Sequence, residues 1–516
     1  MKRLLVLTLT VFLSSQTFAL NWQMVGARHM AMGGAGVATA NGTLAQYYNP
    51  ALLAVYDAYQ KHNEISFNFG LQAETSKALL DATKKLMDMS EQYKGLSADM
   101  SAGNSASPKD LNAVFEGMAE INDLLRNNLG VLTNADAGVG FKLGSFGLSL
   151  RSLGSMAATP VVDKSNILVR SGSTGLTFSS QTELQNASYT SLRDKLKEAI
   201  TNTLIADDLK TFIGANTAQE ERLANILINT IDSYGADKVT ETVNIMCDNM
   251  ASVAEFIKDV SSTGGLYSDN QTRVMADLAA FSEAALGYGF NLTHGISLGA
   301  NIKVIEGTTA QTGIFILSDD MGVGDVIKEA WNNKKFSTNW GVDLGAAVNF
   351  SELFQTDVFF NPQVGITAKN VNSPKFKRPE APTGWALPWN QEDYKLKPQI
   401  RAGAAINPFT KRLTLTADID LNENETVLQD YKSRQLSAGL ELLTIDSYYF
   451  KLPLRFGVNK NLAQSDAPMY FTAGFATVTP VFTFELAAAV GDGTEKVNHK
   501  DIPNAAALSM NFAWFF

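Results

Sequence analysis

Cysteine and histidine are scarce in this sequence. Cys247 is the one cysteine among 516 residues, which excludes an internal disulfide and a Cys-x-x-Cys redox site. The four histidines, His29, His62, His294 and His499, have no metal-ligand spacing. No serine motif accompanies His294 or His499, as a Ser-His-acid hydrolase would require. We therefore expect no metal, no cofactor and no enzymatic activity.

Positive charge and long apolar runs are also lacking. Lys and Arg number 42 against 52 Asp and Glu, and the formal net charge of -10 argues against a nucleic-acid partner. Beyond residue 20, no apolar run approaches the ~20 residues that a membrane-spanning helix needs. A chain without such helices can span a membrane only as a closed β-barrel, because closure satisfies every backbone hydrogen bond.

The N-terminus has the pattern of a signal peptide. Lys2-Arg3 is basic, Leu4 to Leu13 is apolar, and Thr17-Phe-Ala19 supplies the small residues of a cleavage site. The apolar core is too short to cross a membrane as a helix. We expect residues 1–19 to be a signal peptide that is cleaved after Ala19. The mature protein would then be exported to the outer membrane of a Gram-negative bacterium.

The last residues have the pattern of a barrel strand. One face is apolar and the other is small and polar, as is typical of a membrane β-barrel wall. The first face carries Leu508, Met510, Phe512, Trp514 and Phe516, and the second carries Ser509, Asn511 and Ala513. A soluble sheet would rarely end in three consecutive aromatics, because chain ends usually fray. We interpret Trp514 and Phe516 as a C-terminal signal for barrel assembly.

Segments with alternating apolar side chains recur along the chain, each about ten residues long, as expected for tilted strands that cross a ~25 Å apolar band. Residues 296–304 and 413–421 are clear examples. We count fourteen such segments, an even number that suits a bacterial barrel. Long and short connections alternate, for example 155–281 and 293–295, as outer loops and periplasmic turns do. The predicted fold is an all-β membrane barrel with fourteen antiparallel strands.

Two long connections change to a helical period. Residues 76–129 and 187–281 contain apolar side chains at helical spacing, as at Leu192, Leu196 and Ile200. These helices could pack on one another as a small cap, or form a surface that gathers a ligand or contacts a partner. We favour the cap, because apolar stripes mostly form core.

A glycine-rich motif precedes the first predicted strand. Gly33, Gly34 and Gly36 allow tight packing or a bend, and Asn49-Pro50 marks a turn because Pro50 fixes φ and removes a donor. The stretch from Gly26 to Ala51 resembles the start of FadL-superfamily outer-membrane barrels. This resemblance implies that residues 20–60 fold as a plug, or hatch, inside a barrel formed by 61–516. The plug motif residues are Gly33, Gly34, Gly36, Tyr48, Asn49, Pro50 and Ala51.

Later motifs narrow the resemblance. Lys369 to Phe376, Arg401-Ala-Gly403, Leu415 to Leu421 and Leu454-Arg-Phe-Gly457 look like the TraF-type proteins of conjugal transfer, which share FadL-like barrel architecture. The resemblance covers nearly the whole mature chain except the two helical insertions. A thioredoxin-like protein also bears the TraF name, and it needs periplasmic thiol chemistry. This chain differs from that protein, because its single cysteine cannot supply such chemistry.

Charged side chains alternate onto the predicted lumen face of the strands. Both signs occur in similar numbers, which favours ion-pair networks in a plugged barrel over a single-sign filter that selects ions. An open general porin is therefore disfavoured. The predicted lumen residues are Arg151, Lys303, Asp343, Lys369, Arg401, Asp418, Asp420, Glu441, Arg455 and Glu485.

Two functions stay open. The first is a FadL-like channel for uptake of a hydrophobic small molecule, captured by the outer loops and released when the plug shifts, as the resemblance implies. The alternative is a TraF-like barrel that acts as an accessory or scaffold for conjugal transfer or secretion, with proteins of those systems as partners. In both cases outer-membrane lipid surrounds the barrel. A continuous apolar cavity beside the plug would favour the channel, and a barrel packed shut would favour the scaffold.

Overall fold

The computed structural model describes most of the chain outside the N-terminus and several connections. The described residues are 21–55, 63–75, 107–126, 130–161, 163, 178–203, 220–260, 271–315, 323–380, 393–408, 412–428, 431–465, 467–497 and 500–516. The expected signal peptide and its cleavage site at Ala19 lie outside them, as does most of the first helical insertion before Ser107. No helix in the described part of the chain is long and apolar enough to cross a membrane.

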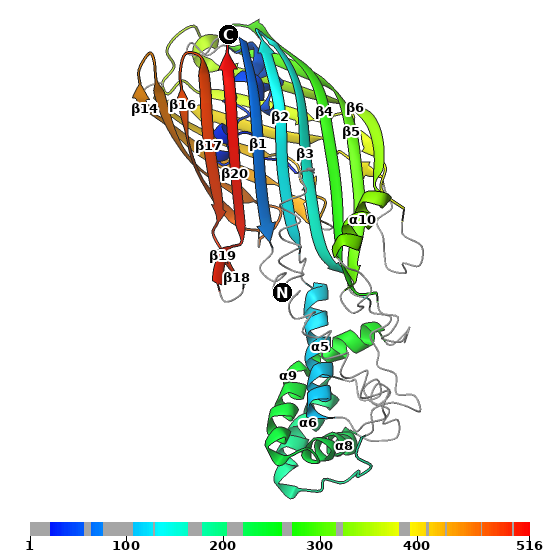
Figure 1. Ribbon diagram of the computed structural model, residues 1–516. Helices are drawn as coiled ribbons and strands as arrows, with labels where there is room; N and C mark the ends of the chain where they lie inside the picture. Colours follow the sequence, from blue (N-terminus) through cyan, green and yellow to red (C-terminus); the bar gives the residue numbers. More distant parts are fainter. Residues whose placement is uncertain are drawn as a thin grey trace.

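The described residues form one closed antiparallel barrel of 14 strands, which confirms the predicted fold class (Figure 1). The barrel closes because the first strand, β1, pairs with the last, β20. In barrel order the strands are β1 (Asn63–Thr75), β2 (Val131–Leu143), β3 (Phe146–Val161), β4 (Arg273–Thr293), β5 (Ile296–Phe315), β6 (Lys335–Asn349), β7 (Gln363–Lys369), β10 (Gln399–Ile406), β11 (Leu413–Asp420), β14 (Gln435–Asp446), β15 (Lys451–Asn461), β16 (Met469–Val478), β17 (Phe482–Gly491) and β20 (Ala505–Phe515).

The connections divide between the two ends of the barrel (Figure 1). The end that holds the C-terminus has short turns and one short helix, α11 (Phe350–Leu353). The opposite end, here called the outer end, carries the long connections. They include α10 (Val323–Asn333) and three small hairpins, β8–β9 (Lys375–Phe376 with Tyr394–Lys395), β12–β13 (Asn424–Glu425 with Lys432–Ser433) and β18–β19 (Thr494–Val497 with Lys500–Pro503).

Side chains alternate between the lumen and the outside of the wall. On β20, Trp514 is half exposed, whereas Ser509 and Asn511 are buried. The outward apolar side chains recur on strands all round the barrel, for example Phe67, Leu148, Leu286, Ile302, Trp340, Ile366, Phe456 and Phe471. A continuous apolar outer surface on a closed barrel is the surface that lipid covers, because water would hydrate it poorly. The wall therefore spans a membrane.

The second helical insertion forms a separate helical body beyond the outer end (Figure 1). It contains α6 (Thr190–Asn202), α8 (Glu220–Asp232) and α9 (Ala236–Val260), and α5 (Pro108–Arg126) of the first insertion packs against α9. The apolar stripes meet one another, since Leu196, Ile200, Leu227, Val239 and Val243 are all buried. The stripes thus form core between helices.

The structure differs from the predicted bounds at β4 and β5. We predicted that the insertion runs to residue 281, but β4 begins at Arg273, and β5 continues to Phe315. Ala279, Ala280 and Phe281 are consecutive and all buried. Both faces of the strand are covered there, so the polar-apolar alternation that marks a half-exposed strand is lost.

The N-terminal segment lies inside the barrel (Figure 1, dark blue). Four short helices shape it: α2 (Ala27–Ala31), η1 (Gly42–Leu44), α3 (Ala45–Tyr48) and η2 (Pro50–Ala54). Asn49 caps η2, because its side-chain oxygen accepts a hydrogen bond from Ala51 N at 3.1 Å and Pro50 occupies the first helical position. Nearly every residue of the segment from Asn21 to Ala54 is buried.

Candidate functional site in the barrel lumen

The plug rests on wall positions that have no side chain. At nine wall glycines, an added Cβ would lie less than 3.0 Å from a plug atom, closer than real side chains approach. Gly299 is paired with both Gly289 and Gly345, Gly365 with Gly403, and Gly439 with Gly457, so the positions adjoin across strands. We call this set the glycine seat: Gly140, Gly289, Gly299, Gly345, Gly365, Gly403, Gly439, Gly457 and Gly474. At five of these positions plug backbone packs directly on wall backbone: Gly289, Gly299, Gly365, Gly439 and Gly457.

Among the predicted plug glycines, Gly33 makes a close contact with the wall, whereas Gly34 and Gly36 pack against other plug residues. Gly33 has φ +68° and Gly34 has φ +88°, conformations that side chains disfavour. A Cβ on Gly33 would lie 2.2 Å from the backbone oxygen of Val458. Gly33 N donates to Thr472 Oγ1 at 3.0 Å, and Gly33 O accepts from Asn459 Nδ2 at 3.0 Å. Gly33 is thus required by close approach as well as by dihedral angle, and Gly34 by its dihedral angle.

The Asn-Pro-Ala motif joins two parts of the plug to the wall. Asn49 Nδ2 donates to Val37 O at 2.9 Å within the plug and to Ala346 O at 3.0 Å on β6. Pro50 and Ala51 pack on Gly299, and Tyr48 is buried with its hydroxyl donating to Val25 O at 2.9 Å. The motif therefore fixes the plug's own fold and its position in the barrel.

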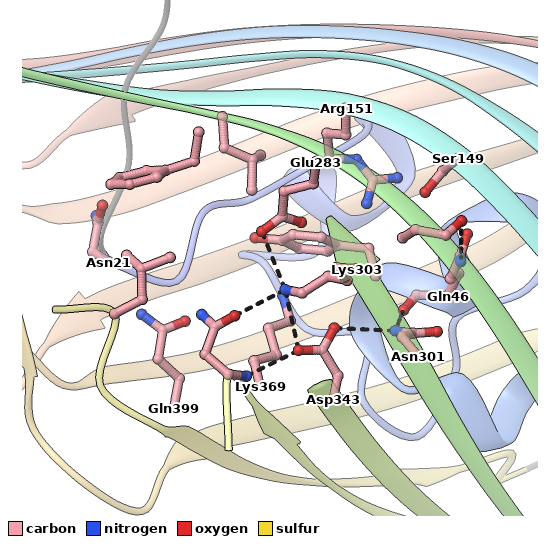
Figure 2. A pocket seen from close by; sticks show the side chains of 16 residues that line it. Asn21, Gln46, Ser149, Arg151, Glu283, Asn301, Lys303, Asp343, Lys369 and Gln399 are labelled. Carbon is pink, nitrogen blue, oxygen red and sulfur yellow. Dashed lines mark hydrogen bonds and ion pairs between the residues drawn. The ribbon is translucent and has the colours of Figure 1, made fainter. Parts of the chain in front are cut away.

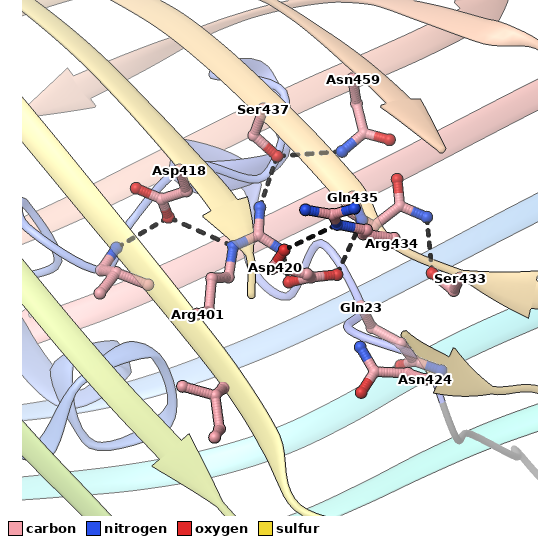
Figure 3. Close-up of polar contacts among 12 residues, drawn as sticks. Gln23, Arg401, Asp418, Asp420, Asn424, Ser433, Arg434, Gln435, Ser437 and Asn459 are labelled. Atoms are coloured by element: carbon pink, nitrogen blue, oxygen red, sulfur yellow. Dashed lines mark hydrogen bonds and ion pairs between the residues drawn. The ribbon is translucent and has the colours of Figure 1, made fainter. Parts of the chain in front are cut away.

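Asp418 and Arg401 hold the plug from β10 and β11. Asp418 Oδ2 accepts from Gly36 N at 2.7 Å and from Val37 N at 3.0 Å. Arg401 lies 3.5 Å from Asp418 Oδ2 and 3.2 Å from Asp420 Oδ1, and its Nη2 donates to Ser437 (Figure 3). All three charged side chains are almost fully buried. One arginine between two carboxylates leaves this group with a formal excess of negative charge that the plug N–H groups partly offset.

A second ion-pair chain crosses from the plug to the far strands. Arg28 Nε of the plug lies 3.0 Å from Glu441 Oε2, and Arg455 Nε lies 2.6 Å from the same oxygen. Arg455 Nη1 then pairs with Glu485 at 2.9 Å, and Glu485 accepts from Asn511 at 3.0 Å. The alternating signs neutralise one another, and the pairing ties the plug to three strands.

A small polar cavity of about 40 Å³ lies against the plug on the other side of the lumen (Figure 2). Lys303 Nζ is at its centre, 3.1 Å from Glu283, 3.1 Å from Asp343 and 2.9 Å from Asn370 Oδ1. Asp343 also accepts from Asn370 N at 2.9 Å. One water molecule needs ~10–15 Å³ of accessible volume, so the cavity holds about three or four water-sized groups.

Two further cations line the cavity without a carboxylate partner. Lys369 Nζ lies 3.0 Å from the centroid of the Tyr47 ring and 3.7 Å from that of Trp22. Arg151 Cζ lies 4.8 Å from the Tyr47 ring. Among the described residues, Lys369 Nζ and Arg151 Nε have no hydrogen-bond partner. Aromatic faces thus contribute to the stabilisation of both cations, together with the charge of Asp136 near Arg151 and of Asp343 near Lys369.

The inward residues of single strands show three layers. Along β5, inside the buried polar residues Gln311 and Thr309 of the outer end, come apolar Ile305, charged Lys303 and then Gly299 under the plug. Phe281, Glu283 and Gly289 repeat the order on β4. The apolar layer, here called the outer layer, is a buried cluster of strand and loop residues: Leu132, Ala157, Ala279, Phe281, Ile305, Phe376, Tyr394, Leu396, Val427, Leu428, Tyr431 and Ala467. Farther toward the outer end, Gln311 donates to Asp277, which also pairs with Arg378.

The predicted lumen charges therefore divide among three groups rather than one network. Lys303, Asp343, Lys369 and Arg151 line the cavity, Arg401, Asp418 and Asp420 hold the plug, and Arg455 joins Glu441 and Glu485. Sequence reasoning missed the glycine seat, although its signal is present as glycines at inward positions of successive strands. It also missed Arg28, Tyr47 and Glu283, whose roles depend on contacts distant in sequence. Within the described residues, no group of three or more His, Cys, Asp or Glu could hold a metal ion.

Three solved structures that are similar to the chain are titled as transporters or channels, and their sequence identity is low. The toluene transporter TbuX of Ralstonia pickettii matches with 10% sequence identity and a TM-score of 0.42. The match covers 95% of this chain and 98% of TbuX. The toluene transporter TodX of P. putida matches with 10% identity, 95% and 98% coverage and TM-score 0.39. The monoaromatic hydrocarbon channel CymD matches with 10% identity, 95% and 97% coverage and TM-score 0.41.

No curated protein matches the sequence. A protein-family model described as "F plasmid transfer operon, TraF, protein" matches residues 46–420. The match begins in the plug, at the residue before Tyr47, and ends at the last residue of β11. It includes the cavity residues except Asn21 and most of the glycine seat, and it covers more than half of the 516 residues. The chain therefore belongs to the family of the F plasmid transfer operon protein TraF.

Proposed function

We propose that the protein is an outer-membrane channel that takes up a hydrophobic small molecule. The observation that carries this proposal is the outer layer. Its aromatic and aliphatic side chains, including Phe281, Phe376 and Tyr394, occupy the lumen between the long connections and the plug. A closed scaffold needs no apolar layer across its lumen, whereas an apolar cargo gains ~25 cal/mol per Å² of surface buried there. The sequence resemblance to FadL-type barrels implies the same cargo class.

Capture would begin at the outer end and proceed inward. Phe376 and Tyr394 belong to the small β8–β9 hairpin of a long connection, and Phe376 packs on Gly307 of β5. Displacing this hairpin exposes Phe281, whose ring centroid lies 4.9 Å from that of Phe376. The seated plug blocks the direct route beyond. Release therefore requires the plug to shift or the cargo to pass beside it.

The test is an uptake assay on the purified protein in lipid vesicles with an apolar fluorescent probe. Phe376→Ala removes a side chain from the outer layer, and we expect uptake to change several-fold, because the layer both binds and closes the lumen. Phe354→Ala is the matched control, since Phe354 is exposed at the opposite end of the barrel. Equal uptake by vesicles with and without the wild-type protein would refute the channel.

A second candidate rests on the family match alone. The description of the family names the transfer operon of the F plasmid, and an accessory of conjugal transfer or secretion would use the helical body as a partner surface. Deleting residues 190–260 should then lower conjugation frequency and leave probe uptake unchanged. Loss of uptake without loss of conjugation would favour the channel over this candidate.

A further inference from the structure

We propose that the lumen cavity beside the plug is a binding site for one small monovalent anion, a halide or the carboxylate of a one- or two-carbon acid. The site lies between Lys369, Arg151 and Tyr47, and it is independent of the cargo proposed above. Lys369 and Arg151 are each 6% exposed, so both charges are largely removed from solvent. An unpaired buried charge is costly, and its cost falls when an ion of opposite sign binds.

The carboxylates near the cavity are already engaged. Glu283 and Asp343 both pair with Lys303, at 3.1 Å each. Asp136, on the neighbouring strand β2 and outside the cavity lining, accepts from Asn68 Nδ2, and its charge acts on Arg151. The cavity lining therefore has three cations against two carboxylates, Arg151, Lys303 and Lys369 against Glu283 and Asp343.

The remaining lining supplies hydrogen bonds that suit an anion. Figure 2 shows Lys369 and Arg151 among the cavity residues, with Asn21, Ser149 and Gln399 on its edge. Lys369 Nζ and Arg151 Nε have donors that no described residue accepts, so each is available to a bound anion. Water could accept hydrogen bonds from these donors, but it would add no negative charge beside Lys369 and Arg151.

Cavity size sets the class of anion. About 40 Å³ admits roughly three or four water-sized groups, which matches bromide, formate or acetate. A phosphate or a longer acid would require the outer layer to move, because Phe281 and Leu396 close the cavity on that side. The anion would act as a counter-ion that fixes Tyr47 and, through it, the plug.

The test uses bromide with the intact protein. Crystals soaked in sodium bromide should show an anomalous peak between Lys369 and Arg151. In solution, bromide should quench Trp22 saturably, since that ring lies 3.7 Å from Lys369 Nζ, and Trp22→Phe should abolish the saturable part. Acetate should compete with bromide, which separates a general small-anion site from a halide-selective one.

Three variants complete the test. Lys369→Met and Arg151→Met should each weaken bromide binding about tenfold or more, as expected for loss of one charge-assisted hydrogen bond. Lys397→Met, which removes an exposed lysine paired with Glu425, should bind bromide as the wild type does. A wild-type cavity without a bromide peak, or equal binding by a folded Lys369→Met protein, would overturn the proposal. The bromide soak of the wild-type crystal is decisive by itself, so the test still holds if either cavity variant fails to fold. Bromide binding and its absence are both compatible with uptake of the apolar probe, so the two proposals can fail separately.

Discussion

Replacing one glycine of the seat should displace the plug. A Cβ at Gly299 would lie 2.3 Å from the carbonyl carbon of Pro50 and 2.4 Å from Ala51 N. Unbonded carbon atoms prefer separations of about 3.5–4.0 Å, so one of the two backbones must move by more than about 1 Å. Overpacking of this kind costs ~1–3 kcal/mol, and here the cost falls on the plug–wall contact, because the β5 backbone is held on both sides by neighbouring strands.

The assay for Gly299→Ala is ion conductance in planar bilayers, together with protease cleavage of the plug. We expect higher conductance and faster cleavage than in the wild type. Gly147→Ala is the matched control, because a Cβ there would meet only flexible side-chain atoms of Gln46 and Leu53, at 3.2 Å. Wild-type conductance and cleavage for Gly299→Ala would refute the direct backbone contact on which the seat depends.

Three further predictions concern the ion pairs, the lipid face and the helical body. Arg28→Ala should lower stability by ~1.5–3 kcal/mol, measured by thermal unfolding in detergent, because Glu441 loses one of two arginine partners; an unchanged midpoint would contradict this pairing. Ile302→Arg should cost ~2–4 kcal/mol in lipid unfolding experiments, since Ile302 is 64% exposed on the outer wall, and no loss would contradict its contact with lipid. Burial raises the pKa of the Cys247 thiol, so alkylation should be slower than for a free thiol at neutral pH and should accelerate as the pH rises, because thiolate is the reactive form. A rate equal to that of glutathione at pH 7 would contradict the half-buried position of Cys247 in α9.

The strands of the barrel wall could be predicted from the sequence, because each strand has one face toward lipid and one toward the lumen. Leu508 to Phe516 and residues 296–304 alternate for that reason, and both are strands. The alternation is lost where both faces of a strand are covered, as at Ala279 to Phe281. The helical insertion was therefore predicted to run to residue 281, although β4 already begins at Arg273. Periodicity detects a difference between two faces and cannot detect a strand without one.

The site was less accessible to sequence reasoning. The inward positions of Lys303, Asp343 and Arg401 follow from the alternation, but their partners depend on which strands adjoin and how the plug lies. Arg28 and Glu441 are 413 residues apart, and no local pattern pairs them. The glycine seat, unlike these ion pairs, could have been predicted from the sequence, because glycines at inward positions of successive strands indicate close backbone approach.

Hydrogen–deuterium exchange of the plug amides in lipid-embedded protein tests the central claim most directly. That claim is that the N-terminal segment is bound to the lumen wall as firmly as the strands are bound to each other. Gly36 N and Val37 N donate to the buried Asp418 carboxylate, so their exchange should be as slow as that of neighbouring amides in β11. Exchange of these two amides at the rate of an exposed loop would show that the plug is not seated and would contradict the account.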